Sequence, residues 1–295
     1  MSESPLQGTP SPEAPFGVDR MIQAIIEPDD VRVLVADASA TAFESEYRHL
    51  AGRLSAQVTA SLCAGAVLLS ADLKHDERLA FQARLTGPLG GFLYEVDQDL
   101  NFRGSTHKKV LPDHDTRGTP ISEALGKGSL QVLRSTSQGI VYQGITTMNA
   151  GNIAADLEQH LMDSQQTLSR VRLDHGYSHQ LTHAMGILIQ ALPTASEAGF
   201  EKIANLVCDR ADALRPWPRN PAALLADVTR GLSCHTVGDR TIQFRCRCTR
   251  DRVIAMLKSV GPPEDGSGWP EVSRVVCAFC ADIFEVTPDE LTRGD

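Results

Sequence analysis

The sequence predicts an α+β protein in which a mixed α/β core domain precedes a helical linker and a small C-terminal domain that contains four clustered cysteines. Residues 79–104 alternate apolar and polar positions in short runs separated by turn residues, as in a strand meander. Residues 54–73 instead carry apolar side chains at helical spacing, which indicates a buried helix. After Pro193 the pattern changes to two short helical segments followed by the cysteines.

The chain divides into segments of different composition. With 295 residues it has room for a large core and a smaller unit, because single cores stop growing near roughly 250–300 residues. We expect a disordered N-terminal tail over 1–18, a core domain over 19–193, a helical linker over 194–233 and a cysteine domain over 234–295. The tail is rich in Pro, Ser, Gly and Glu and has no apolar stretch, which argues against a signal peptide.

The expected core elements follow one another along the chain. The predicted strands are 31–36, 79–85, 92–96, 100–104, 131–133, 140–147, 171–173 and 185–192. The predicted helices are 54–73 and 152–165, and Asn149 and Asn152 are candidate N-caps of the second one. The glycine-rich segment 87–91 lacks the Lys-Ser/Thr ending of a phosphate loop and joins two strand patterns, so we interpret it as a turn.

The linker contains two short helical patterns around a proline break. Phe200 and Leu206 mark the first helix, Leu224 and Leu225 mark the second over 222–232, and Pro216-Trp217-Pro218 interrupts them. Helices this short bury little surface alone, so their order is expected to depend on the neighbouring units.

Bulk properties exclude some functions. The net charge of −9 and a pI near 5.5 argue against a nucleic-acid partner, because phosphate neutralisation supplies most non-specific affinity for nucleic acid. The mean hydropathy of −0.17 and the absence of a long apolar run predict no membrane span. We expect a cytoplasmic protein, in which thiols stay reduced and clustered cysteines are more typical of a metal site than of standing disulfides.

Four cysteines near the C-terminus form two close pairs, Cys246 with Cys248 and Cys277 with Cys280. Two such pairs, separated by a segment long enough to fold back, are what a tetrahedral thiolate zinc site requires. The same sulfurs could instead form two small disulfides. A predicted helix around 253–260 and a return loop over 261–268 would bring the pairs together, and a domain of about 60 residues needs such a staple.

Nearby basic residues bear on the chemistry of the pairs. Arg245, Arg247, Arg250 and Arg252 flank the first pair, and their charge is expected to favour thiolates. A purely structural zinc ribbon, including one that binds nucleic acid or the ribosome, would have the same ligands. A thiol-disulfide oxidoreductase is a third interpretation, although the Cys-X-X-Cys pair lacks a βαβ context and no catalytic triad is evident, so we expect no enzyme.

Other thiol and imidazole groups are weaker candidates. Cys63 lies in the apolar helix pattern and is expected in the core, whereas Cys208 and Cys234 would become reactive only if the linker opened. Their roles are not fixed by the sequence. The spacing of His175, His179 and His183 would align them on a helix for a second metal, but the intervening residues favour a polar loop. 

The C-terminal motif resembles the redox-switch domain of the 33 kDa heat-shock chaperonin family. The resemblance is carried by Phe-Arg-Cys-Arg-Cys-Thr-Arg-Asp-Arg-Val at 244–253 and by Val-Cys-Ala-Phe-Cys-Ala-Asp-Ile-Phe at 276–284. Upstream landmarks are Gly-Pro-Leu-Gly-Gly at 87–91, Tyr-Gln-Gly-Ile at 142–145, Ile-Ala-Ala-Asp-Leu-Glu at 153–158 and Gly-Ile-Leu-Ile-Gln-Ala-Leu-Pro at 186–193. The likeness therefore covers most of the chain after the tail.

The resemblance implies a redox-regulated, ATP-independent holdase rather than an enzyme. In the reduced, poorly active form, one zinc ion per chain would be held by Cys246, Cys248, Cys277 and Cys280. Oxidation with heat would join Cys246 to Cys248 and Cys277 to Cys280, release zinc and unfold the linker. The active form would be a homodimer that binds unfolded or oxidatively damaged clients through a surface that the resemblance does not identify. If the zinc domain covers the linker helices, losing the metal would unfold both.

Overall fold

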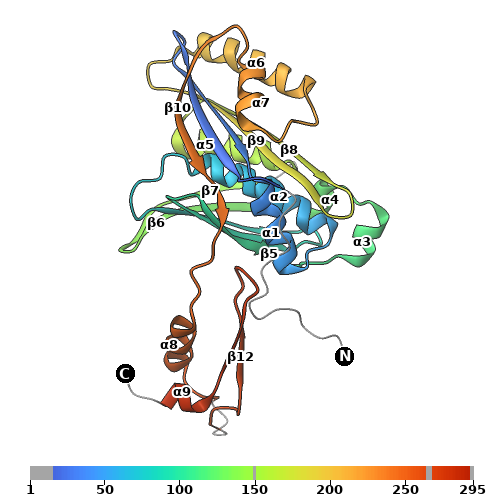
Figure 1. Cartoon of the computed structure of the whole chain (residues 1–295), viewed down its shortest axis with the longest axis vertical. Helices are drawn as coiled ribbons and strands as arrows, with labels where there is room; N and C mark the ends of the chain where they lie inside the picture. The colour runs from blue at the N-terminus through green and yellow to red at the C-terminus, as the bar shows by residue number, and fades with distance from the viewer. Residues whose placement is uncertain (1–15, 149–150, 264–267, 293–295) are drawn as a thin grey trace.

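The structure, a computed structural model, describes residues 16–148, 151–263 and 268–292 and has the predicted α+β class. One sheet has the order β10-β1-β2-β9-β8, from β1 (Arg20–Glu27), β2 (Val31–Asp37), β8 (Ser169–Tyr177), β9 (Leu181–Ala191) and β10 (Ser233–Thr241). The second has the order β11-β5-β4-β3-β6-β7, from β3 (Arg78–Leu85), β4 (Gly91–Asp97), β5 (Asn101–Thr106), β6 (Gly128–Thr136), β7 (Gly139–Met148) and β11 (Gln243–Phe244). A separate unit with the hairpin β12-β13 lies at the far end of the molecule (Figure 1).

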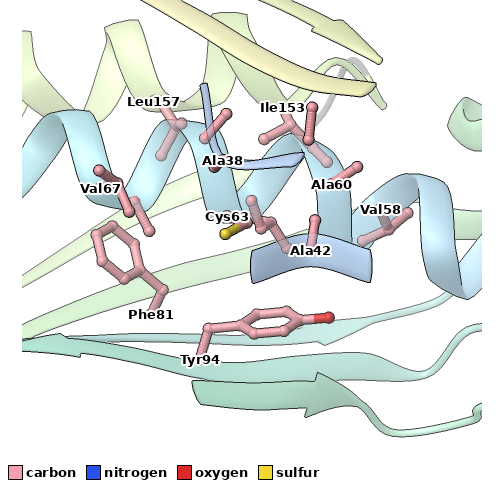
Figure 2. Packing of buried hydrophobic residues seen from close by; sticks show 14 of the residues in the cluster. Ala38, Ala42, Val58, Ala60, Cys63, Val67, Phe81, Tyr94, Ile153 and Leu157 are labelled. Atoms are coloured by element: carbon pink, nitrogen blue, oxygen red, sulfur yellow. The ribbon is translucent and has the colours of Figure 1, made fainter. Parts of the chain in front are cut away.

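The core helix α2 (Arg53–Leu69) lies between the two sheets and contacts strands of both. It is apolar on nearly all sides, as a fully buried helix must be. The helix ends four residues before the predicted limit of residue 73, at a Ser70 C-cap. Figure 2 shows Cys63 of α2 among buried apolar side chains, which confirms the prediction that this thiol belongs to the core.

The remaining helices lie in the core or, at the end of the chain, in the C-terminal unit (Figure 1). They are α1 (Ser39–His49), α3 (Pro112–Arg117), α4 (Ile121–Leu125), α5 (Ile153–Gln165), α6 (Glu197–Ala213), α7 (Pro221–Val228), α8 (Arg250–Val260) and α9 (Pro288–Thr292). Asn152 caps α5 as predicted, since its side-chain oxygen accepts hydrogen bonds from the backbone of Ala154 and Ala155. The other candidate cap, Asn149, lies outside the described residues. Among the described helices, none combines the length and the apolar character needed to cross a membrane.

The predicted strands at 79–104 form the meander β3-β4-β5, with residues 87–91 leading from β3 into β4. The segment around His175, His179 and His183 was expected as a polar loop, and this expectation is wrong for two of the three residues. His175 lies in β8 and His183 in β9, because the two strands extend the hairpin beyond its apolar part. Their register pairs His175 with Ala184 and Gly176 with His183.

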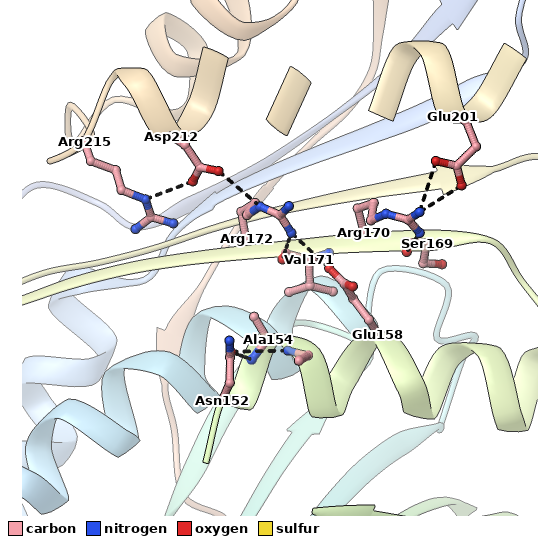
Figure 3. Close-up of polar contacts among 11 residues, drawn as sticks. Asn152, Ala154, Glu158, Ser169, Arg170, Val171, Arg172, Glu201, Asp212 and Arg215 are labelled. Atoms are coloured by element: carbon pink, nitrogen blue, oxygen red, sulfur yellow. Dashed lines mark hydrogen bonds and ion pairs between the residues drawn. The ribbon is translucent and has the colours of Figure 1, made fainter. Parts of the chain in front are cut away.

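The linker helices α6 and α7 pack on the five-stranded sheet rather than under the C-terminal unit (Figure 1). Phe200, Val207 and Leu224 are fully buried against the apolar face that β1, β2 and β9 present. Ion pairs from Arg170 and Arg172 of β8 to acidic residues of α6 reinforce this contact (Figure 3). The order of the linker therefore depends on the core sheet, and the condition that the cysteine unit covers the linker is not met.

Strand β10 (Ser233–Thr241) pairs antiparallel with β1 along its whole length. It belongs to the five-stranded sheet, although the sequence assigns residues from 234 onward to the cysteine domain. Its largely exposed, polar residues hide the strand from pattern analysis because it lies at a sheet edge. The segment limits remain predictions, but the chain connects the linker to the cysteines through a strand of the core.

Candidate metal centre

The C-terminal unit has a very small apolar core. Its apolar cluster consists of the buried residues Val253, Val286 and Leu291, with a few half-buried side chains around them. Helices α8 and α9 pack beside the hairpin of β12 (Ser273–Val276) and β13 (Ile283–Val286). A core of this size stabilises little by itself, so a cross-link or a metal ion is expected to hold the unit.

Each cysteine pair lies in a segment of defined backbone. Cys246 and Cys248 lie between β11 and α8, and Thr249 caps α8 immediately after them by accepting a hydrogen bond from the Arg252 amide. Cys277 and Cys280 lie in the tight turn between β12 and β13. That turn is closed by the Ala281 amide, which donates to the Cys277 carbonyl at 2.8 Å. Ala281 itself has a left-handed φ of 61°, which turns the chain back into β13.

The structure brings all four cysteines together. The Sγ atoms of Cys246 and Cys277 are 3.8 Å apart, those of Cys248 and Cys280 are 3.3 Å apart, and all four lie within 4.8 Å of one another. Tetrahedral bonds of about 2.3 Å to zinc place two sulfurs about 3.8 Å apart. The donor set and its spacing therefore fit a tetrathiolate zinc ion. This is the one group of three or more candidate metal ligands found in the part of the chain that the structure describes.

The thiols in the cluster share a negative charge unequally. Hydrogen bonds from the thiols of Cys277 and Cys280 lower the pKa of Cys246, and Arg103 adds to the effect. The pKa of Cys280 is raised by the same contact with Cys246. One thiolate at Cys246 is thus stabilised by its protonated neighbours. A divalent cation bound by the four sulfurs would take the place of those protons, since thiolates are the ligands that zinc binds.

Arg103 of β5 is a site residue that the sequence did not reveal. Its Nη1 lies 3.6 Å from the Cys246 sulfur, and its guanidinium lies 4.1 Å from the centre of the Phe279 ring. Glu95 of β4 holds the same guanidinium through an ion pair. No spacing rule could have found Arg103, because it lies 143 positions before Cys246 and reaches it only through the docking of two units.

Three of the four arginines predicted to activate the first pair have other partners. Arg247 pairs with Glu95 at 3.1 Å, Arg250 pairs with Glu290 at 2.9 Å, and Arg252 donates to the Arg247 carbonyl at 2.8 Å. These contacts stabilise the fold of the unit and its attachment to the core. The charge next to sulfur comes instead from the core domain.

The turn that carries Cys277 and Cys280 docks on the core. The Phe279 carbonyl accepts a hydrogen bond from the Gly104 amide at 3.1 Å, and the Ser105 hydroxyl donates to the Ala278 carbonyl at 3.0 Å. His49 of α1 also contacts the Phe279 carbonyl, at 3.2 Å, and burial lowers the pKa of His49 to about 4. A neutral His49 at pH 7 can donate to that carbonyl without placing a charge in the interface.

The other predicted candidates lie away from the cluster. Cys208 is buried in α6, where burial raises its pKa to about 11, and Cys234 is half-buried in β10 opposite Ile26. Their reactivity after linker opening stays a prediction. His175 contacts the Ser61 hydroxyl at 3.1 Å, and His183 contacts the Asp174 carboxylate at 3.1 Å, so both imidazoles have structural partners.

Comparison with known proteins gives this architecture a family. The family described as Hsp33 protein matches residues 19–287. The chain belongs to this family. A relative from Synechococcus elongatus named 33 kDa chaperonin is 27% identical over 286 residues, covering 92% of this chain and 96% of the relative. One from Lactobacillus delbrueckii subsp. bulgaricus with the same name is 28% identical over 292 residues, covering 92% and 96%.

A solved structure shares the fold. The crystal structure of the 33 kDa chaperonin (heat shock protein 33 homolog) from Thermotoga maritima has a TM-score of 0.75, with 92% of this chain and 96% of that chain covered. The two sequences are 18% identical, so the likeness concerns the fold alone. It confirms the predicted α+β fold class.

Proposed function

We propose that the chain is a redox-regulated, ATP-independent chaperone that prevents aggregation of unfolding proteins. The observation that carries the proposal is the convergence of four free thiols, within 4.8 Å of one another, in a unit with a very small core. Membership of the Hsp33 family and relatives named 33 kDa chaperonin support the chaperone activity. This function is not enzymatic, and we place the protein in the cytoplasm, where reduced thiols are the normal state.

In the reduced state, Cys246, Cys248, Cys277 and Cys280 would hold one zinc ion per chain. When bound, zinc would tie two segments that the small core holds weakly, with an apparent binding free energy of about 10–16 kcal/mol in small zinc modules. That range equals or exceeds the whole stability of a typical domain, about 5–15 kcal/mol. Folding of the cysteine unit would therefore depend on the four thiolates.

Oxidation by a peroxide would remove the ligands. A cysteine thiolate attacks one peroxide oxygen, the O–O bond breaks, and the departing hydroxide takes up a proton to become water. A second thiol then attacks the resulting sulfenic acid, the S–S bond forms, the S–O bond breaks, and a second water leaves. Four thiols and two hydrogen peroxide molecules give two disulfides and four water molecules.

We assign the disulfides as Cys246 with Cys248 and Cys277 with Cys280, following the family resemblance. In the reduced structure the short Sγ distances join residues of different pairs, at 3.8 and 3.3 Å. Peptide mapping after oxidation distinguishes the two pairings. Linkage of 246 to 277 or of 248 to 280 would contradict the assignment.

Loss of the cysteine unit would reach the linker through the chain itself. The linker helices pack on the core sheet, and β10 joins them to the segment that carries Cys246. Unfolding of the cysteine unit would free the chain beyond Ile242, the residue that follows β10 and is 2% exposed in the core. Opened linker surface would bind unfolded or oxidatively damaged clients, with a homodimer as the active form.

Aggregation of a chemically unfolded client, followed by light scattering without nucleotide, tests the function. The oxidised protein should suppress the scattering, and the reduced, zinc-loaded protein should suppress it weakly. A chromogenic chelator should detect one zinc ion released per chain during oxidation. Failure of the oxidised protein to protect the client would contradict the proposal. Steady turnover of disulfide substrates would favour an oxidoreductase, and salt-sensitive RNA binding would favour a zinc-ribbon module.

A further inference from the structure

The outer edge of β5 is covered by residues that surround the cysteines. Strand β11 pairs with it in parallel, and the amides of Gln243 and Arg245 donate to the carbonyls of Leu100 and Phe102 at 3.3 and 3.0 Å. One step further along β5, the Gly104 amide donates to the Phe279 carbonyl at 3.1 Å. Three backbone groups of this edge therefore have their partners in the C-terminal segment.

The residues that pair with the β5 edge are adjacent in sequence to the cysteines. Arg245 immediately precedes Cys246, and Phe279 lies between Cys277 and Cys280. Unfolding of the cysteine unit would remove both hydrogen-bonding partners together. The backbone of β5 would then have unpaired donors and acceptors while the sheet behind it stayed folded, because β5 also pairs with β4.

An uncovered edge of this kind binds extended peptide chains. Main-chain hydrogen bonds across a sheet edge supply affinity without reading side chains, so they suit partners of any sequence. The strand packs closely in the sheet at this point, since Phe102 is fully buried and a Cβ at Gly104 would collide with the Leu93 carbonyl oxygen of β4. The segment 243–245 shows that an extended backbone fits the edge.

We propose that the β5 edge is a binding site for an extended segment of an unfolded client, covered in the reduced protein by residues 243–245 and Phe279. The inference rests on the proposed function and identifies one binding surface for it. The opposite edge of the same sheet, β7, does not change with oxidation in this scheme. Ile140 and Ile145 of β7 are already 65% and 63% exposed in the reduced fold, so β7 serves as an internal control.

Hydrogen exchange on the full chain tests the site in three states. The Gly104 amide should be protected in the zinc-loaded reduced protein, exchange at least tenfold faster after oxidation, and regain protection when a chemically unfolded client is added. Peptides from β7 should keep the same exchange in the presence and absence of client. Unchanged exchange at Gly104 in an oxidised protein that still suppresses aggregation would overturn the inference and leave the proposed function standing. If the Gly104 amide regained protection without client, and more so at higher protein concentration, the β5 edge would bind a second copy of the chain. That result would also overturn the inference.

A peptide competitor provides the second measurement. A peptide of residues 240–247 with Cys246→Ser should reduce client protection by the oxidised chain at least twofold at saturation. The matched control is the same peptide N-methylated at Gln243 and Arg245, which cannot donate to the Leu100 and Phe102 carbonyls. Equal competition by the two peptides would show that the edge is not used. An oxidised chain that gives no protection before any peptide is added would instead refute the proposed function.

Discussion

Replacing Asp174 with asparagine should loosen the linker without disturbing the cysteines. The buried Asp174 carboxylate accepts a hydrogen bond from the Trp217 amide at 2.9 Å, forms an ion pair with Arg215 at 2.7 Å and contacts His183 at 3.1 Å. Burial acts to raise the pKa of Asp174, but the contacts with His183, Trp217 and Arg215 together lower it to about 2. Because the folded pKa lies below the ordinary value of 3.8, the stabilisation is complete above about pH 4 and is lost as the pH falls toward 2.

The size of the effect follows from these contacts. Hydrogen bonds to a charged group contribute about 1.5–3 kcal/mol each, and an asparagine keeps one acceptor oxygen while losing the charge. Arg215 is 34% exposed, so its share is reduced by solvent. We expect Asp174→Asn to destabilise linker docking by about 2–4 kcal/mol, which raises the open population about 30- to 1,000-fold.

Limited proteolysis of the reduced, zinc-loaded protein measures that population when opening and closing are fast. Cleavage within 194–233 should accelerate by the same factor, while zinc content stays at one ion per chain. Asp212→Asn is the matched control, since Asp212 is 52% exposed in its ion pairs with Arg172 and Arg215 (Figure 3). Exposed pairs contribute about 0–1 kcal/mol, so this control should change cleavage less than about fivefold. Equal cleavage of the two variants would refute the assignment of Asp174 as the clamp of the linker.

Three further changes probe other parts of the structure. Arg103→Ala should weaken zinc binding about 10- to 100-fold in a chelator competition, because it removes the guanidinium next to the Cys246 sulfur. Arg252 contacts the Arg247 carbonyl and no sulfur, so Arg252→Ala should leave zinc affinity unchanged. An equal loss of zinc affinity in the two variants would contradict the role of Arg103. Burial raises the pKa of Asp19 to about 7, so this carboxyl binds a proton more tightly in the folded protein than in the unfolded chain. The free energy of unfolding should therefore fall as the pH rises from about 4 to about 7, by up to about 1.4 kcal/mol per pH unit. Asp19→Asn should flatten that slope in urea titrations, and an unchanged slope would exclude this group as its source. Cys63→Ala should lower the free energy of unfolding in urea by about 1 kcal/mol, because Cys63 is fully buried. The disulfides that peroxide forms should be the same as in the unchanged protein. A different disulfide map by mass spectrometry would show that Cys63 takes part in disulfide formation.

Patterns within short segments predicted the parts of the fold that depend on local physics. The spacing of Cys246, Cys248, Cys277 and Cys280 anticipates a shared site, because each pair lies within one turn of chain. The largely apolar stretch that becomes α2 likewise indicates a helix that is buried on most sides.

Contacts between distant segments left no comparable signal. Strand β10 is polar because it lies at an edge, and its pairing with β1 joins residues more than 200 positions apart. Arg103 reaches Cys246 only because the cysteine turn docks on β5. The linker was equally unpredictable in this respect, since an amphipathic helix reveals that it has a buried face but not which surface covers that face.

The separation of these contacts has a mechanistic consequence. The cysteine unit holds the edge of β5 through Arg245 and Phe279, whereas Asp174 and the apolar face of the core sheet hold the linker. The two sets share no residue, so their free energies should add rather than substitute for one another. In the proposed mechanism, oxidation would remove the first set directly and would reach the linker only by freeing the chain that follows β10. Heat weakens the second set whatever the state of the thiols. In this mechanism full opening would require both signals, because each one alone would leave the other set of contacts in place.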